Sequence, residues 1–191
     1  MLLDKKQINY IYAKFNQRLT RMKTIPAMLH PVPITSSIHA NKVFWKGGFP
    51  GLETDWNIPQ NWSNDKIPSW KTLVVISPQF VKNEYFPTIS SLVNDIAQLE
   101  IKGNAQVNIL EDGKLTIDGL YCDSFGLINH GTLSNEGELN IKNTKINCIR
   151  NFGLVFNENS ISLDQTITEG IYESEESSFV NCGEILELVL R

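Results

Sequence analysis

The second half of the chain repeats a pattern of alternating apolar and polar residues with a period of 22 to 24 residues. Corresponding segments begin at Glu111, Asn135, Asn157 and Asn181, which stand 24, 22 and 24 residues apart. Apolar side chains recur at every second position, which is the period of a β-strand. A unit this short cannot bury its own apolar face, so successive units must stack. The pattern predicts a mainly β protein, a short right-handed parallel β-solenoid over residues 43–191.

Parity along these strands predicts which side chains face the interior. The apolar inward set occupies odd positions: Ala105, Val107, Ile109, Leu115, Ile117, Leu133, Leu139 and Ile141. The same parity turns five asparagines inward, next to corners: Asn129, Asn135, Asn151, Asn157 and Asn181. We expect their amides to bond along the stack as a structural ladder and not to bind a ligand. The glycines beside them are expected to supply the φ angle that each bend needs.

The first 42 residues have a different pattern. Apolar residues at three- and four-residue steps predict an amphipathic helix over 4–22, within an N-terminal helical segment 1–23, and Asp4 can cap it. The opposite face of this helix is basic, so it could lie on an anionic membrane or pack on protein. Residues 24–42 contain three prolines and are expected to form an extended linker. No recognisable signal peptide or membrane-spanning stretch is seen.

Charge divides the 191 residues unevenly. Residues 1–42 carry seven basic residues and one acidic residue, a net charge of +6. Residues 43–191 carry ten basic and twenty acidic residues, a net charge of −10. A protein body this acidic is a poor match for phosphate backbones, so we expect no nucleic-acid partner. A protein partner, a second copy of the chain and a carbohydrate are the remaining alternatives.

Three cysteines, Cys122, Cys148 and Cys182, follow no metal-ligand spacing. We expect small buried residues, with a Cys122–Cys148 bridge between coils as the alternative. Outward carboxylates of Asp112, Glu136 and Glu158 should align on adjacent coils, where like charges repel unless neutralised. Calcium could neutralise them, but a solvated face is the favoured interpretation. No metal and no cofactor are therefore assigned.

An aromatic block precedes the repeats. It contains Phe44-Trp45-Lys46-Gly47-Gly48, then Asp55-Trp56, then Pro59-Gln60-Asn61-Trp62. With the strands that follow, this block resembles the opening of secreted bacterial surface or adhesin-like β-solenoid repeat proteins, many of them exported by the type IX route. The resemblance covers about residues 43–163. It implies a repeat scaffold at the cell surface or outside the cell, whereas the missing signal peptide leaves a cytoplasmic location as the alternative.

Four tryptophans are candidates for ligand stacking: Trp45, Trp56, Trp62 and Trp70. Such rings can form a sugar-binding platform or a partner-binding surface. They can equally form a cap that closes the first end of the solenoid, whose strand edges would otherwise recruit other chains. We favour the cap, because Asp, Asn and Pro beside Trp56 and Trp62 suit a tight turn.

A second candidate surface is the outward apolar stripe of Phe152, Leu154 and Phe156. Apolar side chains on an outer face must be covered or used. Three explanations are open: the helix 4–22 covers the stripe, a second copy or partner protein binds there, or a local register shift turns these residues inward. The stripe is the predicted partner-binding site.

These observations favour a non-enzymatic structural or protein-interaction module of a bacterial surface or secreted system, which binds through its outer faces. A small intracellular protein that binds a partner, as an immunity protein or a cargo does, is one alternative. A carbohydrate-binding or polysaccharide-degrading β-helix is the other, with Asp112, Asp118, Asp123 and His130 as candidate groups. We assign no catalytic residue.

Overall fold

The computed structural model describes residues 40–122, 125–165 and 170–189. The predicted helix 1–23 and most of the linker 24–42 lie outside these ranges, and nothing is concluded about them. The first strand begins at Asn41, so the linker's last residues belong to the β structure. The described residues fall in one unit of the chain, Ser36–Arg191.

The described residues form three parallel sheets. The first contains β1 (Asn41–Phe44), β2 (Thr72–Ile76), β4 (Gln98–Ile101), β7 (Leu127–Asn129), β10 (Ile149–Asn151) and β13 (Ile171–Glu173). The second contains β3 (Thr88–Ile89), β5 (Gln106–Ile109), β8 (Thr132–Asn135), β11 (Leu154–Asn157) and β14 (Ser178–Asn181). The third contains β6 (Lys114–Asp118), β9 (Glu138–Thr144), β12 (Ser160–Gln165) and β15 (Glu184–Val189). Two short 3-10 turns, η1 (Pro59–Asn61) and η2 (Gly119–Tyr121), are the helical elements of this part of the chain.

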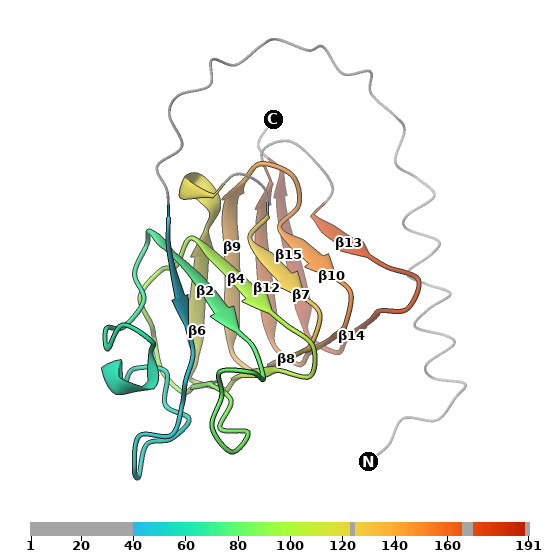
Figure 1. Ribbon diagram of the computed structural model, residues 1–191. Helices are drawn as coiled ribbons and strands as arrows, with labels where there is room; N and C mark the ends of the chain where they lie inside the picture. Colours follow the sequence, from blue (N-terminus) through green and yellow to red (C-terminus); the bar gives the residue numbers. More distant parts are fainter. Residues whose placement is uncertain (1–39, 123–124, 166–169, 190–191) are drawn as a thin grey trace, which may run out of the picture. The chain divides into compact units, whose positions relative to one another are not determined.

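Consecutive strands enter the three sheets in turn, which makes the chain a parallel β-solenoid (Figure 1). Four coils follow one another from residue 98: β4–β6, β7–β9, β10–β12 and β13–β15. The prediction of a mainly β protein built as a parallel β-solenoid is therefore confirmed. Each coil corresponds to one copy of the sequence repeat. Equivalent strands of successive coils pair in the same sheet, so the same pattern of residues recurs in every coil.

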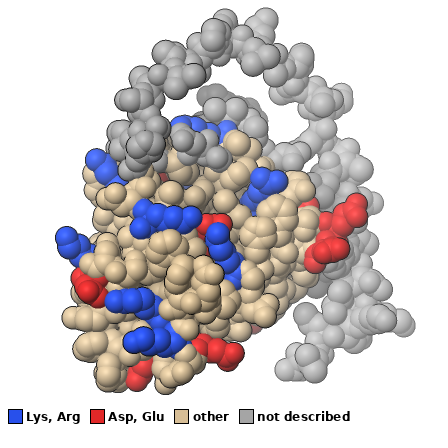
Figure 2. All heavy atoms as spheres, viewed as in Figure 1, with Lys and Arg blue, Asp and Glu red and all other residues tan. Residues whose placement is uncertain are grey.

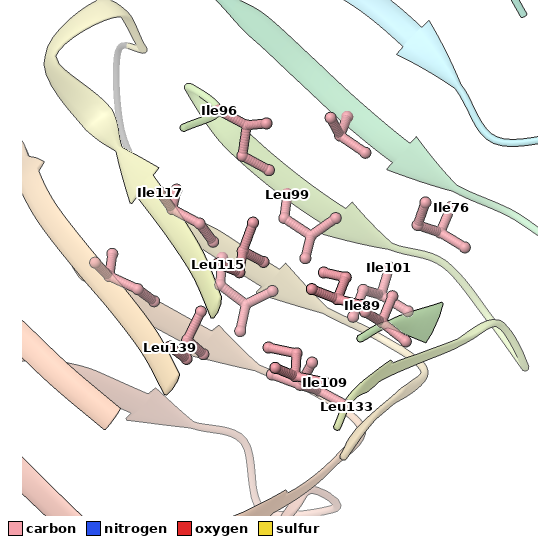
Figure 3. Close-up of a cluster of buried hydrophobic side chains, with 14 of the residues drawn as sticks. Ile76, Ile89, Ile96, Leu99, Ile101, Ile109, Leu115, Ile117, Leu133 and Leu139 are labelled. Carbon is pink, nitrogen blue, oxygen red and sulfur yellow. The ribbon is translucent and has the colours of Figure 1, made fainter. Parts of the chain in front are cut away.

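The interior between the sheets is filled with isoleucine, leucine and valine side chains (Figure 3). All eight residues predicted to point inward are buried, with at most 1% of their surface exposed. Register explains the stacking: Leu133 pairs with Val107 on one side and Val155 on the other. Like side chains thus lie over one another from coil to coil, and the prediction from parity is confirmed.

The inward asparagines form two ladders along the stack. In one, the Asn129 amide donates to the Asn151 side chain at 2.9 Å. In the other, Asn135 donates to Asn157 and Asn157 donates to Asn181, each at 2.6 Å. Except for Asn181, which lies on the last coil, all are fully buried. The predicted structural ladder is confirmed.

The glycines beside these asparagines have a different role from the one predicted. Positive φ angles occur among described glycines only at Gly47, Gly48, Gly51 and Gly103. At the corner glycines, a Cβ atom would instead lie closer than 3.0 Å to a carbonyl oxygen of the preceding coil: Gly131, Gly137, Gly153 and Gly183. The expectation that these glycines supply a special φ is wrong. They are required because two backbones approach too closely for a side chain.

The aromatic block closes the first end of the solenoid. The rings of Trp45, Trp56 and Trp62 are fully buried and contact one another, with centroids 4.7–6.3 Å apart. The Trp45 indole donates to the Tyr85 carbonyl at 2.7 Å, and the Trp62 indole donates to the Trp56 carbonyl at 2.9 Å. Buried Asn61 donates to the carbonyls of Leu52 and Asp55. This end therefore has an apolar core of its own.

The last coil departs from the pattern at two inward positions. Glu173 pairs with Asn151, so a carboxyl group stands where the two preceding coils have asparagine. Glu187 pairs with Leu163, a fully buried inward residue of the preceding coil. Partial burial raises the pKa of the Glu173 carboxyl, although its hydrogen bond with Asn151 opposes that shift.

Glu173→Gln should stabilise the protein at neutral pH. A carboxyl group whose pKa is higher in the folded than in the unfolded state destabilises the fold once it ionises. At a pH below the pKa of the unfolded state the group is protonated in both states, so this penalty disappears. Because Glu173 stays largely exposed, we expect Tm to rise by only about 1–3 °C at pH 7, with no gain near pH 4. Thermal unfolding at both pH values is the measurement. The exposed outward Glu158→Gln is the control, and an equal gain there would contradict the explanation.

Candidate functional site

The predicted apolar stripe lies on the outside of the solenoid. Leu154 and Phe156 point outward from β11, and Leu154 is 38% exposed while Phe156 is half-buried. The strand β11 pairs in unbroken register with β8 and β14, which removes the register shift as an explanation. The helix 4–22, predicted as a cover, lies outside the described residues. Among these residues, the stripe faces outward without an apolar element over it.

Phe152 belongs to a second group of residues, which we call the Arg150 cluster. Its members are Phe125, His130, Arg150, Phe152 and Tyr172. The Arg150 guanidinium carbon lies 4.9 Å from the ring centre of Phe125, 5.0 Å from that of Phe152 and 5.3 Å from that of Tyr172. The His130 ring stacks on Phe152 with centroids 4.6 Å apart and planes 6° from parallel. Three aromatic rings thus lie around one cation, and an imidazole stacks on one of these rings.

The repeat brings these residues together. Ile128, Arg150 and Tyr172 form one outward row across β7, β10 and β13. His130 and Phe152 follow those strands at the same corner of adjacent coils, 22 residues apart. The sequence interpretation identified only Phe152 in this role. A search of the same 22-residue spacing for cationic and aromatic residues, and not only for apolar ones, would have found Arg150 and Tyr172.

The guanidinium of Arg150 has no carboxylate partner among the described residues. Five lysines there pair with carboxylates, for example Lys42 with Glu100 at 3.7 Å and Lys102 with Glu100 at 3.1 Å. Arg150 in this part of the chain has neither an ion pair nor a side-chain hydrogen-bond acceptor. Its five N–H donors are held in place by ring contacts, which leaves them available to an acceptor from outside.

The tryptophan candidates divide into two groups. Trp45, Trp56 and Trp62 have no exposed surface, so no ligand can stack on their rings without opening the cap. Trp70 is 47% exposed, and the Lys71 ammonium lies 4.2 Å from its ring centre. Ligand stacking therefore remains a prediction that concerns Trp70.

The carboxylates considered for hydrolysis are engaged or exposed. Asp118 accepts from the backbone N–H of Leu120 and from the side chain of Asn143. Desolvation lowers the pKa of the nearby Lys142 ammonium, but the carboxylates of Asp118 and Asp95 outweigh it and raise that pKa overall. Asp112 is exposed, and Asp123 lies outside the described residues. Among the described residues, no group of three or more His, Cys, Asp or Glu is arranged to hold a metal ion.

None of the three cysteines is part of a disulfide bond in the structure. Cys122 and Cys148 are buried, and Cys182 is exposed. The alternative of a Cys122–Cys148 bridge is thus not what the structure has. Burial raises the pKa of the Cys148 thiol, although its hydrogen bond with Thr144 at 3.4 Å opposes that shift, so the thiol stays protonated at neutral pH.

Comparison of the chain with protein-family models, curated proteins and solved structures gives no match. No family is therefore assigned, and the architecture that the structure shows is a parallel β-solenoid. Within the described part of the chain, no helix has the length and apolar character to cross a membrane. The site must accordingly be interpreted from its own chemistry.

Proposed function

We propose that this protein is a non-enzymatic interaction module, which binds a protein partner through the Arg150 cluster and the neighbouring Leu154. The observation that carries the proposal is the Arg150 guanidinium, which lies among three rings and has no carboxylate partner among the described residues. The exposed Leu154 follows four residues later in the chain. Arginine and aromatic residues are enriched among the side chains that dominate binding energy at protein interfaces. No catalytic step is part of this proposal.

The solenoid supports such a role because it fixes the site in place. Arg150 and Tyr172 come from adjacent strands of one sheet, where β10 is anchored by buried Ile149 and β13 pairs with β10 in register. The rings limit the rotamers of the guanidinium, so little conformational entropy is lost when an acceptor binds. A partner that offers a carboxylate or carbonyl to Arg150 and an apolar group to Leu154 would match the surface.

The system in which the module works follows from the resemblance of the aromatic block. We propose a bacterial surface or secreted assembly, with a right-handed winding of the coils as in other solenoids of that kind. The alternative is a small intracellular protein that binds or carries a partner. Both alternatives use the same outer surface, so the site can be tested before the location is known.

A photo-crosslinking residue, p-benzoylphenylalanine, placed at Leu154 tests the proposal in cells that naturally produce the protein. We expect one discrete protein adduct from this position and a reduction of at least about fivefold when Arg150→Gln is added. Leu92, an exposed apolar residue beside β6, is the control position and should give no such adduct. The same adduct from both positions, or one that Arg150→Gln leaves unchanged, would overturn the proposal.

A further inference from the structure

The last described coil leaves a strand edge on each of the three sheets. β13, β14 and β15 are terminal in their sheets, so one side of each strand has no backbone partner. The inward residues Ile171, Phe179 and Ile185 are only partly buried. Their counterparts one coil earlier are fully buried: Ile149, Val155 and Ile161. This end offers both apolar surface and unpaired backbone groups, the combination that recruits another strand.

The surface of this coil is acidic. Two exposed carboxylates, Glu173 and Glu187, stand in register with inward residues of the preceding coil, and Glu175, Glu176 and Glu184 are further exposed acidic residues of this coil. No lysine or arginine occurs between residues 151 and 190. Figure 2 shows acidic side chains at the right-hand edge, where the turn after β13 lies in Figure 1. The end therefore combines an open apolar layer with negative charge.

The charges decide which kind of strand can bind. An apolar strand would bury the Glu173 carboxylate without a partner, which is costly. A second copy joined by the same end would bring two sets of carboxylates together. A second copy joined by its other end would meet β1, whose Phe44 carbonyl already accepts from the backbone N–H of Ser63 in the aromatic block. Neither a second copy of the chain nor an apolar strand therefore matches this end of the solenoid, whereas a strand with basic side chains would neutralise the carboxylates.

We propose that this end of the solenoid binds a basic polypeptide segment, which adds to the open edges of β13, β14 or β15 as a further strand. Backbone hydrogen bonds to the edge would supply affinity, and lysine or arginine side chains placed against Glu173 and Glu187 would supply selectivity. An apolar residue two positions away from the basic one lies on the same face of the segment and would cover Ile185 on β15 or Ile171 on β13. Tyr172 of the Arg150 cluster also lies on β13, but successive strand residues point to opposite faces, so its side chain is turned away from that of Glu173. The argument does not use the cluster and is independent of the proposed function.

The probe is a fluorescent synthetic peptide about eight residues long, the length of a typical strand, in which every second position carries valine and lysine in turn with threonine between them. Valine and lysine then lie on the same face, so that one can cover Ile185 while the other meets Glu187. The affinity of this peptide for the full chain is measured by fluorescence anisotropy, and hydrogen exchange of the chain is followed with and without peptide. Glu173→Gln/Glu187→Gln is the test variant. Glu136→Gln/Glu158→Gln removes the same charge from the exposed outer face and is the matched control.

We expect the test variant to weaken binding at least about tenfold and the control at most about twofold. We also expect the peptide to slow amide exchange in β13–β15 but not in β6 or β9. Equal weakening by both variants would mean diffuse attraction to an acidic protein and would overturn the proposal. Absence of peptide binding would overturn it too, as would concentration-dependent dimers in light scattering that persist without peptide and disappear in the test variant.

Discussion

Replacing Gly137 with alanine is expected to reduce the free energy of unfolding by about 3 kcal/mol or more. An alanine Cβ at this position would lie closer than 3.0 Å to two backbone carbonyl oxygens, those of Leu110 and Gly113. Neither oxygen can turn aside as a flexible side chain could. The Gly113 oxygen also accepts from the backbone N–H of Glu138 at 2.9 Å, so moving it breaks the pairing of the coils.

Gly51→Ala is the control for this prediction. A Cβ there would meet nothing within 4 Å, but the φ angle of +83° disfavours a side chain. Its cost should be about 1 kcal/mol, the strain of a positive φ alone. Urea unfolding of both variants gives the comparison. If Gly51→Ala proved the more destabilising of the two, the corner glycines would not be there to allow close backbone approach.

The sequence predicts the interior of this protein well because two physical periods coincide. Alternation sets which face of a strand is buried, and the 22- to 24-residue spacing sets which residues stack. Leu133 and Asn135 were placed inward on those grounds alone, and both are fully buried. The role of Gly137 was wrongly predicted because the distance between two stacked backbones has no signature in the local sequence.

The Arg150 cluster could be predicted only in part, because it depends on contacts between outward residues. Outward positions tolerate almost any residue, so a cation there has no evident meaning until its neighbours are known. Phe152 attracted attention as an apolar exception, whereas Arg150 looked like an ordinary surface charge. The structure changes this interpretation, since three rings surround the guanidinium and no carboxylate of the described residues pairs with it.

Replacing Asn157 with leucine should reduce the free energy of unfolding by about 2–4 kcal/mol, from the loss of two buried hydrogen bonds. The Asn157 side chain accepts from Asn135 and donates to Asn181, so it is the middle rung of its ladder. Leucine fits the volume but leaves polar groups unpaired on both sides. Asn181→Leu is the control, and it should cost less because that side chain is half-buried on the last coil.

The triple variant Asn135→Leu/Asn157→Leu/Asn181→Leu should cost less than the sum of its three single changes. Each single change leaves the hydrogen-bond partner of the replaced asparagine unpaired, whereas the triple change removes both partners of each bond together. The core already stacks leucine in neighbouring rows, as at Leu133 and Leu139. Urea unfolding of the four variants measures this coupling. If the free-energy costs of the three single changes add up to that of the triple change, the amides act separately. If the triple change costs much less than this sum, the amides act together and the ladder serves mainly to hold the coils in register.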